Sequence, residues 1–90
     1  MRYAARVEVR LRPGIADPEA ATIERALPAL GFEDVRGVRA GRSFRFEIDA
    51  SDADAARRRA EDLASRLLAN PVIEDSEVEL QLLEPARGSR

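Results

Sequence analysis

The 90-residue sequence contains no cysteine, no histidine and no tryptophan. The absence of cysteine excludes disulfides, thiolate nucleophiles and cysteine-bound metal ions. The absence of histidine removes the commonest general base and the commonest metal ligand. No apolar run approaches membrane-spanning length, and the first residues show no signal-peptide core. The chain is therefore expected to carry no catalytic residues of its own and to act in the cytoplasm.

Lysine is also missing, so that all 15 basic residues are arginines. They are balanced by 17 acidic residues, and the net charge is −2. A nucleic-acid-binding domain usually carries a basic surplus, so this balance disfavours nucleic acid as a partner. The arginine bias is typical of a GC-rich genome. Adaptation to heat is the weaker alternative, because the usual thermophile signal is lysine together with glutamate.

Three stretches alternate apolar and polar residues as half-buried strands do, at 3–11, 42–49 and 73–82. Residues 32–39 contain two valines and are predicted to form a short fourth strand. A glycine-containing turn separates it from the strand at 42–49, so the two are expected to form a hairpin.

Two helices are predicted between these strands. The first begins at Asp17-Pro18-Glu19, which supplies an N-cap, a proline for the first helical position and an acid that complements the helix dipole. Pro28 is expected to bend or fray its last turn, and Gly31 to end it. The second helix runs from a capping box that begins at Ser51 to about Ala69.

The element order β-α-β-β-α-β is that of a ferredoxin-like α+β fold, with an antiparallel sheet and two helices on one face. In that topology the strands at 3–11 and 42–49 are central. Residues 1–83 are predicted to form one domain, and 84–90 a flexible C-terminal tail. The strand at 73–82 is then an edge strand, which we expect another protomer or a partner to cover.

The two faces of the predicted sheet differ in character. Phe44 and Phe46 lie on the apolar face with the helix stripes, so they belong to the core and not to a base-stacking surface of the RNA-binding kind. The opposite face is charged, and a solvated surface is favoured over a docking surface. Its charged residues are Arg6, Glu8, Arg10, Arg45 and Glu47.

No residue pattern indicates acid–base, nucleophilic or phosphate-loop chemistry. Glu74-Asp75 is an adjacent acidic pair, which suits a turn into a strand better than a cation site. The turns at 12–14 and 39–42 contain arginines, whose planar donor fork suits a phosphate or the carboxylate of a partner. A structural turn is favoured for each of them, taken alone.

Four segments carry a family resemblance. They are Arg12-Pro13-Gly14-Ile15-Ala16-Asp17-Pro18, Ala29-Leu30-Gly31-Phe32, Val38-Arg39-Ala40-Gly41-Arg42 and Leu67-Leu68-Ala69-Asn70-Pro71-Val72-Ile73-Glu74-Asp75. With this spacing, the chain resembles the PurS family of small subunits of phosphoribosylformylglycinamidine synthase over residues 3–82. The last segment is the most specific. The sequence departs from the family where Glu19-Ala20 replaces the usual Gln-Gly, and where Arg12 replaces a frequent lysine.

The resemblance implies a non-catalytic assembly subunit of an ATP-dependent, glutamine-hydrolysing ligase in de novo purine biosynthesis. Proteins of this family act with a large synthetase subunit and a glutaminase subunit, which together convert formylglycinamide ribonucleotide, ATP and glutamine to formylglycinamidine ribonucleotide. They form homodimers or homotetramers, bridge the two catalytic subunits and assist ammonia transfer. ATP and Mg²⁺ are expected in the synthetase subunit, whereas no cofactor, metal, nucleic acid or membrane is expected to bind this chain.

Eight turn residues are predicted to contact a partner or to set local geometry. Gly14, Asn70 and Pro71 among them also suit a purely structural role. The alternative function is a small-molecule-sensing regulatory domain of ferredoxin-like fold, which a thermal shift with a free metabolite distinguishes. The eight residues are Arg12, Gly14, Asp17, Arg39, Gly41, Arg42, Asn70 and Pro71.

Overall fold

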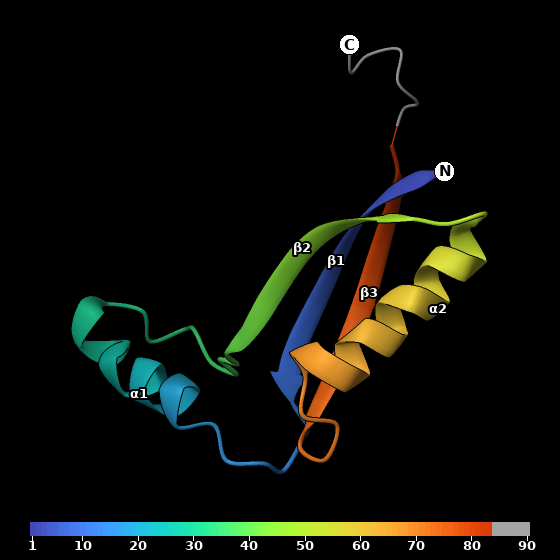
Figure 1. The fold of residues 1–90 in the computed structure, drawn as a ribbon. Helices are drawn as coiled ribbons and strands as arrows, with labels where there is room; N and C mark the ends of the chain where they lie inside the picture. Colours follow the sequence, from blue (N-terminus) through green and yellow to red (C-terminus); the bar gives the residue numbers. More distant parts are fainter. Residues whose placement is uncertain (84–90) are drawn as a thin grey trace.

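The computed structural model describes residues 1–83, so the predicted tail at 84–90 lies outside the described residues. Three strands and two main helices alternate along the chain (Figure 1). The ferredoxin-like α+β class is confirmed. The elements are β1 (Arg2–Leu11), α1 (Pro18–Ala26), a 3-10 helix (Pro28–Leu30), β2 (Gly41–Asp49), α2 (Ala53–Leu63), its π-helical continuation (Ala64–Leu68) and β3 (Glu74–Leu82).

The three strands form an antiparallel sheet in the order β2-β1-β3, with β1 in the middle. Arg6 of β1 marks the register, because it lies opposite Arg45 of β2 on one side and Glu79 of β3 on the other. Backbone hydrogen bonds in both directions between Met1 and Ala50 close one end of the β1–β2 pair at 2.9 Å.

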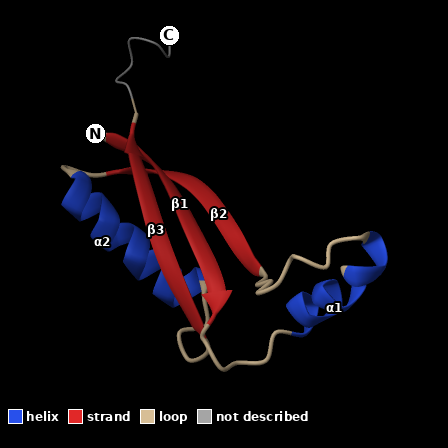
Figure 2. Cartoon of the chain, turned by 180° about the vertical axis from the view of Figure 1, so that it is seen from behind, coloured by secondary structure: helices blue, strands red, loops and turns tan. Residues whose placement is uncertain are grey.

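The core lies between the sheet and α2. Val7, Val9 and Val78 point from β1 and β3 toward Ala60 and Ala64, and all five side chains are buried. Alanine has no bulk beyond Cβ, so α2 approaches the sheet closely and fills the space against the valines. Figure 2 shows α2 alone lying across the sheet, behind the strands in that view.

The prediction of a strand at 32–39 is wrong. Within residues 1–83 this segment forms turns and irregular chain. Its apolar residues Phe32, Val35 and Val38 recur every third position, so they do not alternate between two faces as strand residues must. Gly37 adds a φ of 74°, which interrupts an extended backbone. As a consequence β2 is an edge strand, and its predicted central position is wrong as well.

The first helix does not cover the sheet in this protomer, although two helices on one face were expected. It lies beyond the end of the strands, on the β2 side (Figures 1 and 2). Only Ala20 of α1 is buried, whereas Ile23 is 43% exposed and Leu30 of the following turn 68%. The missing fourth strand explains this position, because no strand brings the chain back along the sheet after the helix.

The helix ends follow local chemistry. Asp17 caps α1 as predicted, by accepting a hydrogen bond from the backbone of Ala20. The α-helix stops before Pro28, and Gly31 ends the 3-10 turn in the left-handed conformation. The cap of α2 is Asp52 and not the predicted Ser51, since the Asp52 carboxylate accepts from the third residue along. No helix among residues 1–83 is long and apolar enough to cross a membrane.

We predict that Ala60→Leu destabilises the protein by about 1–3 kcal/mol, because a larger side chain does not fit between α2 and the valines of the sheet. Glu61→Leu is the matched control, since Glu61 is exposed one position further along the same helix. Urea denaturation at equal protein concentration gives both free energies of unfolding. An unchanged midpoint for Ala60→Leu would contradict the close packing of α2.

Candidate functional site

The eight predicted site residues come together at one end of the sheet. We call this end the junction and define it by residues 11–17, 38–42 and 70–75. Here β1 ends, β2 and β3 begin, and the chain leaves toward α1 (Figure 1). Three segments far apart in the sequence therefore meet in one place, and specific hydrogen bonds hold them there.

Asp17 connects the start of α1 to the start of β2. One carboxylate oxygen accepts from the backbone N–H of Ala20 at 3.1 Å, and the other accepts from the backbone N–H of Ala40 at 3.2 Å. Glu24 adds a second connection, because it accepts from the backbone N–H of Val38 at 2.9 Å. These two acids hold α1 to the segment that leads into β2.

Glycine is required at Gly41 by close contact with β1. A Cβ atom at this position would lie 2.6 Å from the carbonyl oxygen of Val9, which is a backbone atom that cannot turn aside. Glycine is favoured at Gly14 for a different reason, because its φ of 87° lies in the left-handed region. Both glycines therefore set geometry, and neither offers a side chain to a partner.

Arg12 holds the loop between α2 and β3 against the end of β1. Its guanidinium donates to the carbonyl oxygen of Pro71 and lies 3.3 Å from the carboxylate of Asp75. Its backbone N–H donates to the carbonyl of Ile73 at 2.9 Å. The side chain remains 47% exposed, so several of its donors still face solvent.

Glu74 is the central acceptor of the junction, and the predicted site set does not contain it. Its carboxylate accepts from the backbone N–H of Asn70 at 2.7 Å and from Arg42 at 3.0 and 3.1 Å. The side chain is only 15% exposed. The Asn70 hydrogen bond, and then Arg42, hold the pKa of Glu74 below its usual value. The turn into the strand lies at 71–73, one step before the predicted pair, and Glu74 and Asp75 are the first two residues of β3.

One local signal does identify Glu74 from the sequence. Asn70 and Pro71 end a helix, and an acid four residues after such an end can reach back to the free backbone N–H groups of the turn. Asn70 completes the turn itself, because its side-chain oxygen accepts from the backbone N–H of Val72 at 3.0 Å.

Arg39 is the least engaged arginine of the predicted set. It donates once, to the carbonyl oxygen of Leu11 at 3.0 Å, and makes no ion pair with any of residues 1–83. Arg42, by contrast, is bound to Glu74 and lies 5.5 Å from the ring centre of Phe44. Arg39 therefore has the most donors free for a partner.

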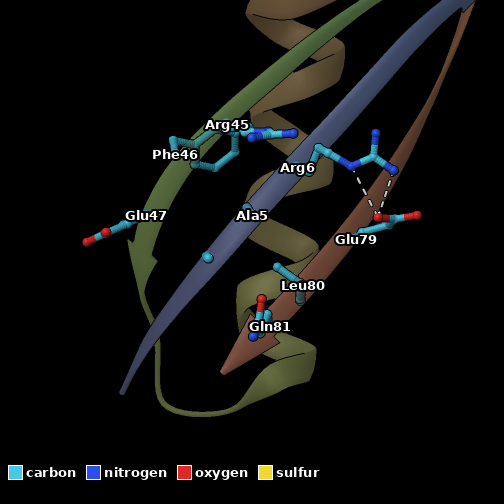
Figure 3. Close-up of a pocket in the computed structure, with 9 residues that line it drawn as sticks. Ala5, Arg6, Arg45, Phe46, Glu47, Glu79, Leu80 and Gln81 are labelled. Atoms are coloured by element: carbon cyan, nitrogen blue, oxygen red, sulfur yellow. Dashed lines mark hydrogen bonds and ion pairs between the residues drawn. The ribbon is translucent and has the colours of Figure 1, made fainter. Parts of the chain in front are cut away.

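Two hollows of the described surface differ in size and place. The junction contains a cavity of about 220 Å³ between Arg12, Asp17 and Arg39, which is below the usual size of a ligand site. A larger hollow of about 590 Å³ lies on the charged face of the sheet (Figure 3). There Arg6 donates to Glu79 at 2.8 Å, and this hydrogen bond raises the pKa of Arg6.

The charged side chains of the junction are engaged mainly with one another and with the backbone. Its carboxylates accept from backbone N–H groups and arginines, so none is placed as a free acid or base. Within residues 1–83, no group of three metal-ligating side chains is close enough to hold an ion. What remains is a rigid surface at which exposed arginine donors project from fixed backbone positions.

Comparison with known proteins gives consistent matches over almost the whole chain. Residues 4–82 match the family model PurS, described as phosphoribosylformylglycinamidine (FGAM) synthase. The relative from Methanothermobacter thermautotrophicus is 42% identical over 84 residues, which are 93% of this chain and 99% of the relative. The relative from Methanocaldococcus jannaschii is 34% identical over 82 residues, which are 91% of this chain and 99% of the relative. Both are named phosphoribosylformylglycinamidine synthase subunit PurS.

Solved structures agree with these sequence matches. The crystal structure of Methanocaldococcus jannaschii PurS has a TM-score of 0.81 and 35% identity, and covers 91% of this chain and 99% of its own. A chain in the structure of PurLQS from Thermotoga maritima has a TM-score of 0.82 and 30% identity. The match covers 90% of the present chain and 99% of the Thermotoga maritima chain.

Gly41→Ala is predicted to destabilise the protein by about 1–3 kcal/mol, because the added methyl group forces β1 and β2 apart at Val9. Ser43→Ala is the control, since it changes an exposed residue of the same strand. Thermal and urea denaturation of the two variants measure the difference. Equal stability of Gly41→Ala and wild type would show that the strands do not approach this closely.

Glu74 is predicted to make stability depend on pH. Because the folded state lowers its pKa, the stabilisation is complete above the ordinary value of about 4.3 and is lost as pH falls through the folded value. The difference in unfolding free energy between wild type and Glu74→Gln should therefore shrink below about pH 4. Glu61→Gln controls for the loss of one surface charge. A difference that stays constant down to pH 3 would contradict the prediction.

Proposed function

The chain belongs to the PurS family, and we propose that it serves as the small, non-catalytic subunit of phosphoribosylformylglycinamidine synthase in purine biosynthesis. The observation that carries this proposal is the match over residues 4–82, which spans nearly the full length of both the chain and its relatives. The relatives are named as subunits of this synthase, and the Thermotoga maritima PurS subunit is given the activity EC 6.3.5.3.

We propose that the chain assembles with a synthetase subunit and a glutaminase subunit, as a similar chain does in PurLQS from Thermotoga maritima. The complex would convert formylglycinamide ribonucleotide, ATP and glutamine to formylglycinamidine ribonucleotide in the cytoplasm. ATP and Mg²⁺ would bind in the synthetase, and glutamine would be hydrolysed by the glutaminase. A chain without cysteine or histidine suits the remaining task, which is to bridge the two catalytic subunits and assist ammonia transfer.

The junction is the proposed contact surface for a catalytic subunit. Arg12 and Arg42 are each about half exposed, and Arg39 has no carboxylate partner among the described residues. Arginine binds carboxylates through a planar pair of donors, so carboxylates on the other subunit fit these side chains. The geometry-setting members of the set, Gly14 and Gly41, would act by fixing where the arginines stand.

The sensor alternative is not favoured. The relatives share the synthase-subunit name, and the junction cavity is too small for a typical metabolite. A small-molecule sensor would also gain stability from its ligand by mass action. Thermal melting of the purified chain with amino acids and nucleotides tests this second function directly.

Reconstitution with the synthetase and glutaminase subunits tests the proposed function. We expect glutamine-dependent synthesis to require this chain, and synthesis from added ammonia by the synthetase to proceed without it. Arg39→Ala should weaken assembly about tenfold, because a charged contact of roughly 1–2 kcal/mol is lost. Arg36→Ala, in the same exposed loop, is the matched control. Full glutamine-dependent activity without the chain would overturn the proposal.

A further inference from the structure

The outer edge of β3 presents a row of backbone groups to the surroundings. Backbone hydrogen bonds from Leu83 to Arg2 and from Arg12 to Ile73 show that the odd-numbered residues along β3 face β1. The even-numbered residues therefore direct their N–H and C=O groups away from the sheet. No segment of residues 1–83 pairs with this side of β3. An edge of this kind is a template for the strand of another chain.

The strand itself lacks the features that usually protect such an edge. The nine residues of β3 contain no proline and no basic residue. The ladder with β1 runs without a bulge from Glu74 to Leu82. Apolar side chains alternate along its α2 side, and Leu82 is 53% exposed. Natural sheets protect edges of this length with lysine, proline or bulges, so protection of β3 must come from elsewhere in the fold.

The side chain of Arg57 occupies the centre of this edge. Its guanidinium donates to the carbonyl oxygen of Val78 at 3.0 Å. Val78 is the middle residue of β3 and lies opposite Val7 of β1 in the ladder. Its carbonyl is therefore one of the outward-facing groups, and an added strand would need it as an acceptor.

The position of α2 explains how Arg57 reaches the strand. Helix α2 lies on the β3 side of the sheet (Figures 1 and 2). Ala56 and Ala60 are fully buried, and Ala60 packs in the same core as Val78. Because Arg57 directly follows Ala56, its side chain leaves the helix at the margin of this buried stripe. The long aliphatic stem can then pass along the packed face while the charged group ends at the edge.

The two arginines that follow make no such contact. Arg57, Arg58 and Arg59 are consecutive and exposed. Within the part of the chain that the structure describes, none of the three forms an ion pair, and Arg57 alone donates a side-chain hydrogen bond. The charge of Arg57 thus has no carboxylate partner among residues 1–83. A strand that approached β3 would meet this cation at the middle of the edge.

We propose that Arg57 closes the β3 edge to strand addition. An incoming strand must displace the guanidinium from the Val78 carbonyl and leave a charged donor without its acceptor, which is unfavourable. Charged side chains at a sheet edge are a known means of preventing edge-to-edge pairing. Here the side chain comes from a helix and not from the strand. Another chain was expected to cover this edge, whereas Arg57 protects it from within the protomer. The inference goes beyond the proposed function, since it concerns a surface that is kept from other chains.

Aggregation of two matched variants tests the role of Arg57. Thioflavin T fluorescence and light scattering follow the growth of β-rich aggregates at equal protein concentration. Arg57→Leu should raise the rate about fivefold or more, because its β3 edge is open to strand pairing. Arg58→Leu makes the same change one residue further along, at an exposed side chain without the hydrogen bond to β3. Its rate should stay within about twofold of wild type.

A lysine on the strand itself should restore the protection. Ser76 is exposed, and its backbone groups face outward two residues before Val78. Adding Ser76→Lys to Arg57→Leu should return the rate to within about twofold of wild type, since an edge lysine opposes strand addition. Ser65→Lys is the control, because it adds the same charge at the exposed end of α2. In the Arg57→Leu background it should leave the rate high.

Three results of these measurements would overturn the proposal. Equal rates for Arg57→Leu and Arg58→Leu would show that Arg57 does not close the edge. Restoration by Ser65→Lys as complete as that by Ser76→Lys would assign the effect to net charge. A rate that stays high with Ser76→Lys would assign it to unfolding and not to the edge. Because no catalytic subunit is needed, these outcomes are independent of the reconstitution assay.

The hydrogen bond can also be observed directly in solution. The NMR shift of the Val78 carbonyl carbon depends on the donor that it accepts from. Arg57→Leu should therefore move this resonance, whereas Arg58→Leu should leave it in place. An unchanged Val78 carbonyl resonance in Arg57→Leu would show that the contact is not formed, and the proposal would then be wrong.

Discussion

The packing of two alanines of α2 onto the valines of β1 and β3 is the contact on which the protomer depends. Val7 and Val9 are the largest fully buried side chains, and Ala60 and Ala64 close over them. This is a small core for a chain of 90 residues. A short domain buries a modest fraction of its surface and has a narrow margin of stability. Association with other chains therefore adds stability that the protomer does not generate alone.

Two carboxylates organise the junction end of this sheet. Asp17 joins the start of α1 to the start of β2, and Glu74 joins the end of the α2 turn to Arg42. Each acid accepts hydrogen bonds from backbone N–H groups, so its carboxylate fixes the position of the surrounding chain. The arginines are left partly exposed around these fixed points, with Arg39 the least engaged. Such an arrangement suits recognition of another protein's carboxylates and leaves the chemistry to the catalytic subunits.

Much of the fold is predictable from the sequence, because strict alternation identifies all three observed strands and Asp17-Pro18 identifies the start of α1. The strand expected at 32–39 does not form, because its apolar residues recur every third position and Gly37 has a φ of 74°. The meeting of the eight turn residues is not visible locally, since it depends on pairing β1 with two strands distant in the sequence. Glu74 was expected in a turn that enters a strand and is instead the first residue of β3, and its bond to Arg42 is a long-range contact that no local pattern shows.

The contrast between the two helices has a consequence for motion. Helix α2 packs against the core through its buried alanines Ala56 and Ala60. By contrast, α1 buries a single alanine and is held by Asp17 and Glu24. Segments with few buried contacts open at lower free energy than the core. Amide hydrogens of α1 should thus exchange with solvent long before those of β1 and α2. The molecule therefore combines a packed sheet and α2 with a tethered helix, α1, whose apolar side chain Ile23 is open to another surface.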